Sequence, residues 1–146
     1  MRGMEQTDDR AAEIEFLNDG MKTVPLHAQM GLRVHDLGAR TTLTMELSES
    51  VRGGFEGSIH GGMLATFADA ASAMALSGSF DPESQFPVTT DMHIRYYRQP
   101  RGGPLTANAT MVHTGRRLLS CECAIEDAES RVLARATATY MVVPRQ

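Results

Sequence analysis

The sequence predicts an α+β fold in which an antiparallel sheet wraps around a long central helix, with a short helix near the N-terminus. From Gly62 to Ser77 the side chains are nearly all apolar or small on every side, which is typical of an enclosed helix. Four strand-like segments follow it, separated by short polar turns. With 146 residues and 42% hydrophobic content, the chain fits one domain with a modest core. We expect residues 10–146 to form this domain and residues 1–9 to be a flexible tail.

The first element in chain order is the short helix. It is predicted to begin at Asp9, because Ile14, Leu17 and Met21 recur at helical spacing, and Gly20 is a stop signal near its end.

Strands are predicted on both sides of the central helix. Residues 42–47 alternate polar side chains with Leu43, Met45 and Leu47, which indicates a strand with one buried face, and residues 37–39 form the bend before it. Residues 49–58 and the proline-containing segment 80–87 are predicted loops. The last four strands are expected within residues 88–98, 104–114, 117–127 and 131–143, and their close spacing predicts an antiparallel meander.

The composition disfavours several classes of protein. No apolar segment approaches the roughly 20 residues needed to cross a bilayer, and the first ten residues lack the apolar stretch of a signal peptide, so we expect a cytoplasmic protein without membrane association. The net charge is −4, yet from Met92 onward eight arginines outnumber four acidic residues. These arginines are dispersed and aromatics are only 5% of the chain, which disfavours nucleic acid and favours a small phosphorylated ligand. The alternative is that the arginines simply cover the solvent face of the sheet.

The two cysteines are expected to be reduced residues of the core. Cys121 and Cys123 are two positions apart in one predicted strand, so both point to the same face and are badly placed for a mutual disulfide. Two cysteines alone do not form a zinc site, and we expect no metal.

Asp69, a single carboxylate inside the central helix, is the first candidate functional residue. An ionised carboxylate in a dry interior is costly unless it is paired or hydrogen-bonded. One explanation is structural, with a bond from Thr66 or Ser72 or from a neighbouring chain. The other is that Asp69 acts as a base or nucleophile at a site that opens between subunits.

The segment His60-Gly61-Gly62 opens the same helix. The first N–H groups of a helix have no intrahelical partner, so they can polarise a carbonyl and stabilise an oxyanion, and glycine allows close approach. His60 is either a cap of the helix or a contributor to this site. Nine residues of helix rise about 13 Å. His60 and Asp69 therefore cannot meet within one chain, and a joint role requires a dimer with composite sites.

Together these features resemble the hotdog-fold acyl-CoA thioesterases of the phenylacetate-degradation (PaaI-like) type. The resemblance runs from about Gly31 to Val143 and rests on GSIHGG, on Asp69 nine residues after His60, on VTTDMHIRYYRQP and on RATATYMVV. It implies a hotdog fold, a homodimer whose sheets join edge to edge, and frequent assembly into a homotetramer.

The resemblance also implies roles for individual residues. Asp69 is expected to be the general base or nucleophile, and the Gly61 N–H to polarise the thioester carbonyl from the opposite subunit. His60 is expected to orient the loop or the carbonyl, and Thr89 to position the attacking water. The expected substrate contacts, including a turn near the nucleotide end of coenzyme A, are Gly62, Gly54, Met63, Phe67, Gly115, Arg116 and Arg117.

The function implied is hydrolysis of a small or medium acyl-CoA, aromatic ones included, to the free acid and coenzyme A. Coenzyme A is part of the substrate, and no separate cofactor is expected. At Gly54 many relatives carry an asparagine or glutamine, which puts the rate in doubt more than the reaction class. Two alternatives stay open, a hotdog dehydratase or hydratase that uses His60 as a proton shuttle, and a non-catalytic acyl-CoA binding module.

Overall fold

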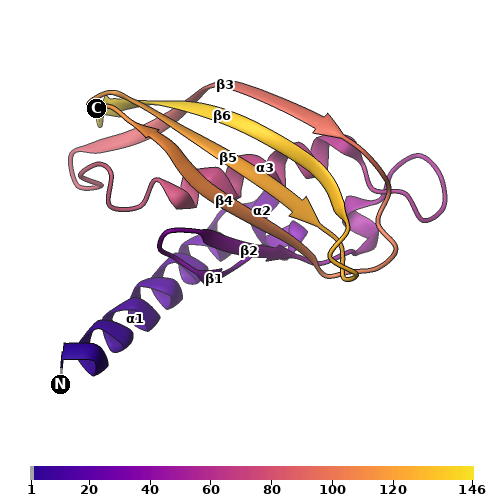
Figure 1. Ribbon diagram of the computed structural model, residues 1–146, viewed down its shortest axis with the longest axis horizontal. Helices are drawn as coiled ribbons and strands as arrows, with labels where there is room; N and C mark the ends of the chain where they lie inside the picture. Colours follow the sequence, from indigo (N-terminus) through magenta and orange to yellow (C-terminus); the bar gives the residue numbers. More distant parts are fainter. Residues whose placement is uncertain (1) are drawn as a thin grey trace.

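The computed structural model describes residues 2–146, with side chains described from residue 7 onward. One six-stranded antiparallel sheet, in the order β1-β2-β4-β5-β6-β3, curves around the helix α3 (Figure 1). The predicted α+β class and the central helix are therefore confirmed. The helical elements are α1 (Arg2–Thr23), α2 (Pro25–Met30), the 3-10 turn η1 (Glu49–Val51) and α3 (Gly61–Ala75). The strands are β1 (Arg33–Asp36), β2 (Thr41–Met45), β3 (Gln85–Tyr96), β4 (Leu105–Thr114), β5 (Leu118–Glu126) and β6 (Val132–Pro144).

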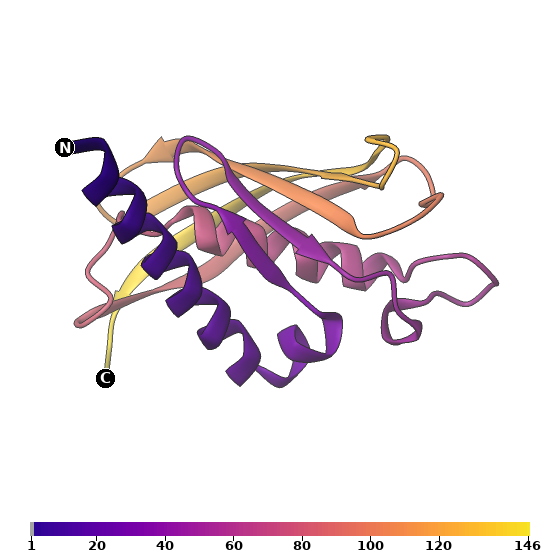
Figure 2. The same ribbon diagram turned by 90° about the horizontal axis from the view of Figure 1, so that it is seen from below.

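The helix α3 lies along the inner face of the sheet (Figure 2). Its side chains Leu64, Phe67 and Ala71 are at most 3% exposed. The facing strand positions are largely alanines, which let the helix approach the sheet closely; they are Ala107, Ala109, Ala134, Ala136 and Ala138. Leu43 and Met45 of β2 are fully buried, as the alternation in that segment predicts.

The position of β3 corrects the predicted meander. Strands β4, β5 and β6 are sequential neighbours, but β3 pairs with β6, from Gln85 opposite Pro144 to Tyr96 opposite Ala134. The connection after Tyr96 crosses the end of the sheet to reach β4 on the far side of β5. Turn signals mark where each strand ends, but they do not determine which edge of the sheet the next strand joins. The expectation that all four strands pair in sequence order is therefore wrong for β3.

The crossing connection is held by Asp127 in the turn between β5 and β6. The Asp127 carboxylate is only 3% exposed and accepts backbone N–H groups of Arg101, Glu129 and Arg131 at 3.0–3.1 Å. Burial raises the pKa of Asp127, but these donors and the Arg131 guanidinium outweigh it, so the pKa lies below its ordinary value. One ionised side chain thus fastens two loops that are distant in sequence.

The N-terminal helix is longer than predicted. It begins at Arg2 and continues through Gly20 to Thr23, so the expected start at Asp9 and the expected stop at Gly20 are both wrong. The chain changes direction only before Pro25, the first residue of α2. Met1 lies outside the described residues, and the division into a flexible tail of residues 1–9 and one domain stays a prediction. The helix α2 and the strand β1 were not predicted from the sequence.

The two edges of the sheet differ. At β1, the Asn18 side chain of α1 donates to the Val34 carbonyl at 2.9 Å and accepts the Val34 N–H at 2.7 Å. It takes the place of a neighbouring strand there. The other edge is β3, beside which no further strand lies within residues 2–146. An open edge of 12 residues is a ready pairing surface for another chain.

Both cysteines are free and buried, as expected. Burial raises the pKa of the Cys121 thiol to about 11 and that of the Cys123 thiol to about 12. Neither is a thiolate near neutral pH, so both are packing residues. Among the described residues, no helix combines the length and the apolarity that crossing a membrane requires.

Candidate functional site

Asp69 lies in the middle of α3, half-buried, and the sheet holds its carboxylate. The Thr89 hydroxyl of β3 donates to Asp69 Oδ1 at 2.9 Å, and the Tyr140 hydroxyl of β6 donates to the same oxygen at 2.8 Å. Thr89 and Tyr140 are directly opposite each other in the paired strands, which explains why both reach one atom. The predicted partner Thr89 and the predicted carboxylate are thus brought together.

A β-bulge aims Thr89 at the helix. The register of β3 against β6 shifts between Thr89 and Asp91, so Thr90 is an extra residue in β3. Beyond the bulge, Met92 and Ile94 are the residues of β3 that pack against the core. Side chains alternate between the two faces of a regular strand, so an odd-numbered residue such as Thr89 would face away from the core when Met92 and Ile94 face it. The extra residue of the bulge turns Thr89 back to the inner face.

Tyr140 is the site residue that the sequence analysis missed. Its side chain is 1% exposed, in a strand whose other inward positions are mostly alanines. A buried tyrosine hydroxyl needs a hydrogen-bond partner, and this isolated inward tyrosine is the signal that could have identified it. Burial, and then the charge of Asp69 and the hydrogen bond to it, raise the pKa of Tyr140. The phenol therefore stays protonated and remains a donor.

Two of the partners that the structural explanation offered for Asp69, Thr66 and Ser72, are not among the described donors to its carboxylate. Thr66 donates instead to the Gly62 carbonyl at 2.9 Å. Within the described side chains, Asp69 Oδ2 has no hydrogen-bond partner. Burial lowers the pKa of His27 in α2, and the negative charge of Asp69 partly opposes this shift.

The N-terminus of α3 has one available backbone donor. His60 is the N-cap, and its Nδ1 accepts the Gly62 N–H at 3.0 Å. The His60 N–H donates to the Val51 carbonyl at 2.9 Å, and the Met63 N–H donates to the His60 carbonyl at 2.9 Å. Of the four N–H groups that a helix leaves unpaired at this end, only that of Gly61 finds no acceptor among the described residues.

A hollow of about 290 Å³ lies beside Gly61. The Tyr96 hydroxyl donates to the Gly61 carbonyl at 3.0 Å, and the Gln99 side chain accepts the Ile59 N–H at 2.9 Å, so the end of β3 fixes the start of the helix. The walls are both apolar and polar, and they consist of Ile59, Gly61, Leu64, Tyr96, Tyr97, Arg98 and Gln99.

The other predicted substrate contacts are scattered. Phe67 is fully buried in the core, Met63 is half-buried against it, and Gly54 lies in an exposed loop with no heavy atom within 4 Å of where a Cβ would be. Gly115, Arg116 and Arg117 form the turn between β4 and β5, at the opposite end of the sheet from Gly61.

Gly61 and Asp69 do not meet within one chain. Eight residues of helix separate them by about 12 Å.

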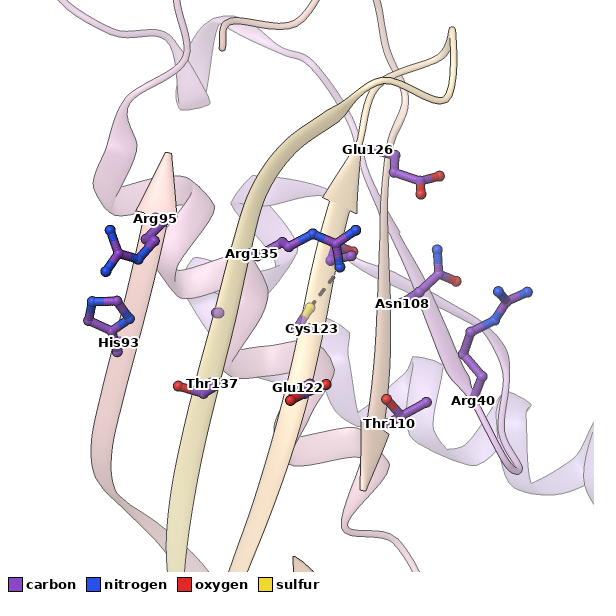
Figure 3. Close-up of a pocket in the computed structure, with 12 residues that line it drawn as sticks. Arg40, His93, Arg95, Asn108, Thr110, Glu122, Cys123, Glu126, Arg135 and Thr137 are labelled. Atoms are coloured by element: carbon purple, nitrogen blue, oxygen red, sulfur yellow. Dashed lines mark hydrogen bonds between the residues drawn. The ribbon is translucent and has the colours of Figure 1, made fainter. Parts of the chain in front are cut away.

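The outer face of the sheet has a larger hollow, of about 610 Å³, that is separate from these groups (Figure 3). It is lined by strand side chains that point away from α3, such as Arg135, Glu122 and His93. No predicted site residue lines it. The described side chains also include no group of three or more histidines, cysteines or acids placed to share a metal ion.

Comparisons with known proteins find similarity to thioesterases. The family model described as "Thioesterase superfamily" matches residues 56–134. The medium/long-chain acyl-CoA thioesterase YigI of Escherichia coli is 28% identical over 96 residues, in a match that covers 58% of this chain and 62% of that protein. The chain thus matches less than two thirds of the length of this relative.

Solved structures share the fold. A thioesterase from Haemophilus influenzae superposes with a TM-score of 0.82 at 23% identity, covering 90% of each chain. A mutant thioesterase from Pseudomonas aeruginosa superposes with a TM-score of 0.84 at 23% identity, covering 90% of this chain and 94% of that one.

Proposed function

This chain belongs to the thioesterase superfamily, and from that premise we propose that it is an acyl-CoA thioesterase that releases a free acid and coenzyme A. One observation supports the proposal most strongly. The same helix carries a half-buried carboxylate, Asp69, and, at its N-terminus, the Gly61 N–H, which has no acceptor among the described residues. A base or nucleophile and an oxyanion donor are the two groups that hydrolysis of a thioester needs.

The proposed reaction follows from these two groups. The thioester carbonyl oxygen accepts the Gly61 N–H, and the positive end of the helix dipole stabilises the oxyanion that develops. Asp69 either takes a proton from a water that attacks the carbonyl carbon, or attacks that carbon itself to give an anhydride that water then hydrolyses. In both routes the carbon–sulfur bond breaks, the sulfur leaves as a thiolate that takes up a proton, and the acyl group leaves as the acid.

The proposed active unit is a homodimer with two composite sites. Because Gly61 and Asp69 are about 12 Å apart along one helix, they cannot act on one carbonyl unless a second copy supplies one of them. The open edge of β3, which carries Thr89, is the surface on which the second copy would pair, and a two-fold axis would generate two equal sites. Pairing of two such dimers into a homotetramer is part of the same proposal.

The proposed substrate is a small or medium acyl-CoA, aromatic acyl groups included. The hollow beside Gly61, with Leu64, Tyr96 and Tyr97 in its walls, offers an apolar surface of suitable size for such a group. The exposed Arg116 and Arg117 would bind phosphates of coenzyme A. The phenylacetate-degradation subtype and a cytoplasmic location remain parts of the proposal, the latter supported by the two unpaired thiols.

The geometry favours hydrolysis over the two alternatives. A dehydratase would use His60 as a proton shuttle, but His60 Nδ1 accepts the Gly62 N–H as the cap of α3, so only Nε2 is left for proton transfer. A binding module would have no need for a carboxylate held by two hydroxyl groups.

The test is release of coenzyme A from phenylacetyl-, benzoyl-, hexanoyl- and palmitoyl-CoA by the parent protein, Asp69→Asn and Asp9→Asn. Asp9 is exposed on α1, away from the edge of β3, and is the control for the change of charge. We expect Asp69→Asn to lose at least about a hundredfold in kcat, and Asp9→Asn to stay within about twofold of the parent. No release from any substrate, or full activity of Asp69→Asn, would refute the proposal. Turnover of an enoyl thioester without thiol release would indicate a dehydratase.

A further inference from the structure

We propose that Tyr140 is a positioning residue that fixes the Asp69 carboxylate and leaves Oδ2 as its reactive oxygen; this rests on the proposed function. The two sheet donors converge on Oδ1, at 2.8 Å from Tyr140 and 2.9 Å from Thr89. A carboxylate bonded in this way cannot rotate freely, and its second oxygen keeps its lone pairs for a proton or a carbonyl carbon.

Tyr140 contacts the backbone of α3 as well as the Asp69 carboxylate. Its hydroxyl also lies 3.0 Å from the backbone carbonyl oxygen of Asp69, so its single proton is shared between a main-chain acceptor and the nearer carboxylate oxygen at 2.8 Å. The ring of Tyr140 is buried in a cluster with Leu119 and Val142, so the phenol is held in place before any substrate binds, which is what precise positioning requires.

The two donors are not equivalent. Thr89 is exposed in the single chain, so a water molecule can replace its hydroxyl. Tyr140 is 1% exposed, and its ring packs with Leu119 and Val142 in a closed cluster, so no water can take the place of its hydroxyl. Loss of the Tyr140 hydroxyl should therefore affect the carboxylate more than loss of the Thr89 hydroxyl.

Tyr140 does not itself act on the substrate. The hydroxyl donates to Asp69, and the pKa of the phenol is raised, so it offers neither a free proton nor a base. Its contribution is to the orientation of Asp69, which should appear in kcat and not in substrate binding.

The test compares Tyr140→Phe, Thr89→Val and Thr139→Val. Phenylalanine keeps the buried ring and removes only the hydroxyl. Thr139→Val is the matched control, because Thr139 directly precedes Tyr140 in the same strand, faces the other side of the sheet and bonds Ser120 at 3.1 Å. We expect Tyr140→Phe to lower kcat about 10- to 100-fold with KM within about twofold, and Thr89→Val to lower kcat less. Thr139→Val should match the parent.

Crystal structures of the variants provide a readout that does not depend on activity. We expect Asp69 in one orientation in the parent and in Thr89→Val, where Tyr140 alone holds it, and in more than one orientation in Tyr140→Phe. Equal kcat in Tyr140→Phe and in the control would overturn the inference. A disordered Asp69 side chain in Thr89→Val would also overturn it, and this second result does not require Tyr140→Phe to fold. If the parent released no coenzyme A, the proposed function would fail, whereas the orientation of Asp69 would still test the role of Tyr140.

Discussion

Replacing Gly61 with proline would remove the proposed oxyanion donor while leaving the helix intact. Proline has no N–H and is favoured in the first turn of a helix, where that N–H is unpaired in any case. The preceding residue, His60, has φ −68° and ψ 124°, the extended conformation that a following proline requires. No hydrogen bond would be lost within the chain, because the Gly61 N–H has no acceptor among the described residues.

The Gly61→Pro change should therefore lower kcat without lowering the stability of the folded protein. Losing one oxyanion donor costs about 10²–10³ in kcat, or about 2.7–4 kcal/mol of transition-state stabilisation. The folded state should lose nothing, and a glycine-to-proline change at a compatible position adds about 0.4–1 kcal/mol of stability. Gly61→Ala is the control, since it keeps the N–H and its Cβ would meet the Tyr96 ring at an ordinary 3.5 Å.

The assay is steady-state release of coenzyme A together with thermal unfolding of both variants. We expect Gly61→Pro to be folded and at least about a hundredfold slower than Gly61→Ala. Equal rates in two folded variants would refute the assignment of the Gly61 N–H as the oxyanion donor.

Three further predictions concern other groups. Asp127→Asn should lower the free energy of unfolding by about 2 kcal/mol at pH 7. The pKa of Asp127 is depressed, so this stabilisation is complete above about pH 4 and is lost as the pH falls through the folded-state pKa; urea unfolding should show the variant and the parent converging there. In Asp69→Asn the pKa of His27 should fall further, because the opposing charge is gone, and an NMR titration that showed a rise would contradict this. His60→Ala should cost about 1 kcal/mol of stability through the lost cap, and His60→Asn should restore most of it in chemical unfolding.

The sequence was most informative where a pattern is local. The all-round apolar character of residues 62–77 predicts an enclosed helix, and the helix that lies under the sheet is α3, Gly61–Ala75. The spacing of His60 and Asp69 likewise shows that the two cannot meet in one chain. Both results depend only on helix geometry, which the sequence determines directly.

The features that were missed depend on contacts between distant segments. The pairing of β3 with β6 requires a connection across the end of the sheet, which no turn signal indicates. The role of Tyr140 depends on this pairing, because only then does it lie opposite Thr89. The extra residue Thr90 reverses which side chains before it face the core, and so turns Thr89 inward. The sequence of the strand is compatible with either register, so it does not indicate this reversal.

Complementation between two inactive variants tests the central claim most directly. Asp69→Asn and Gly61→Pro subunits would be mixed by co-expression, and release of coenzyme A measured against each variant alone. If each site combines Gly61 of one subunit with Asp69 of the other, a mixed dimer has one intact site and one doubly defective site. With random pairing, about a quarter of all sites are then intact, so we predict about a quarter of the parent activity. Activity that stays at the level of the separate variants would contradict a composite thioesterase site.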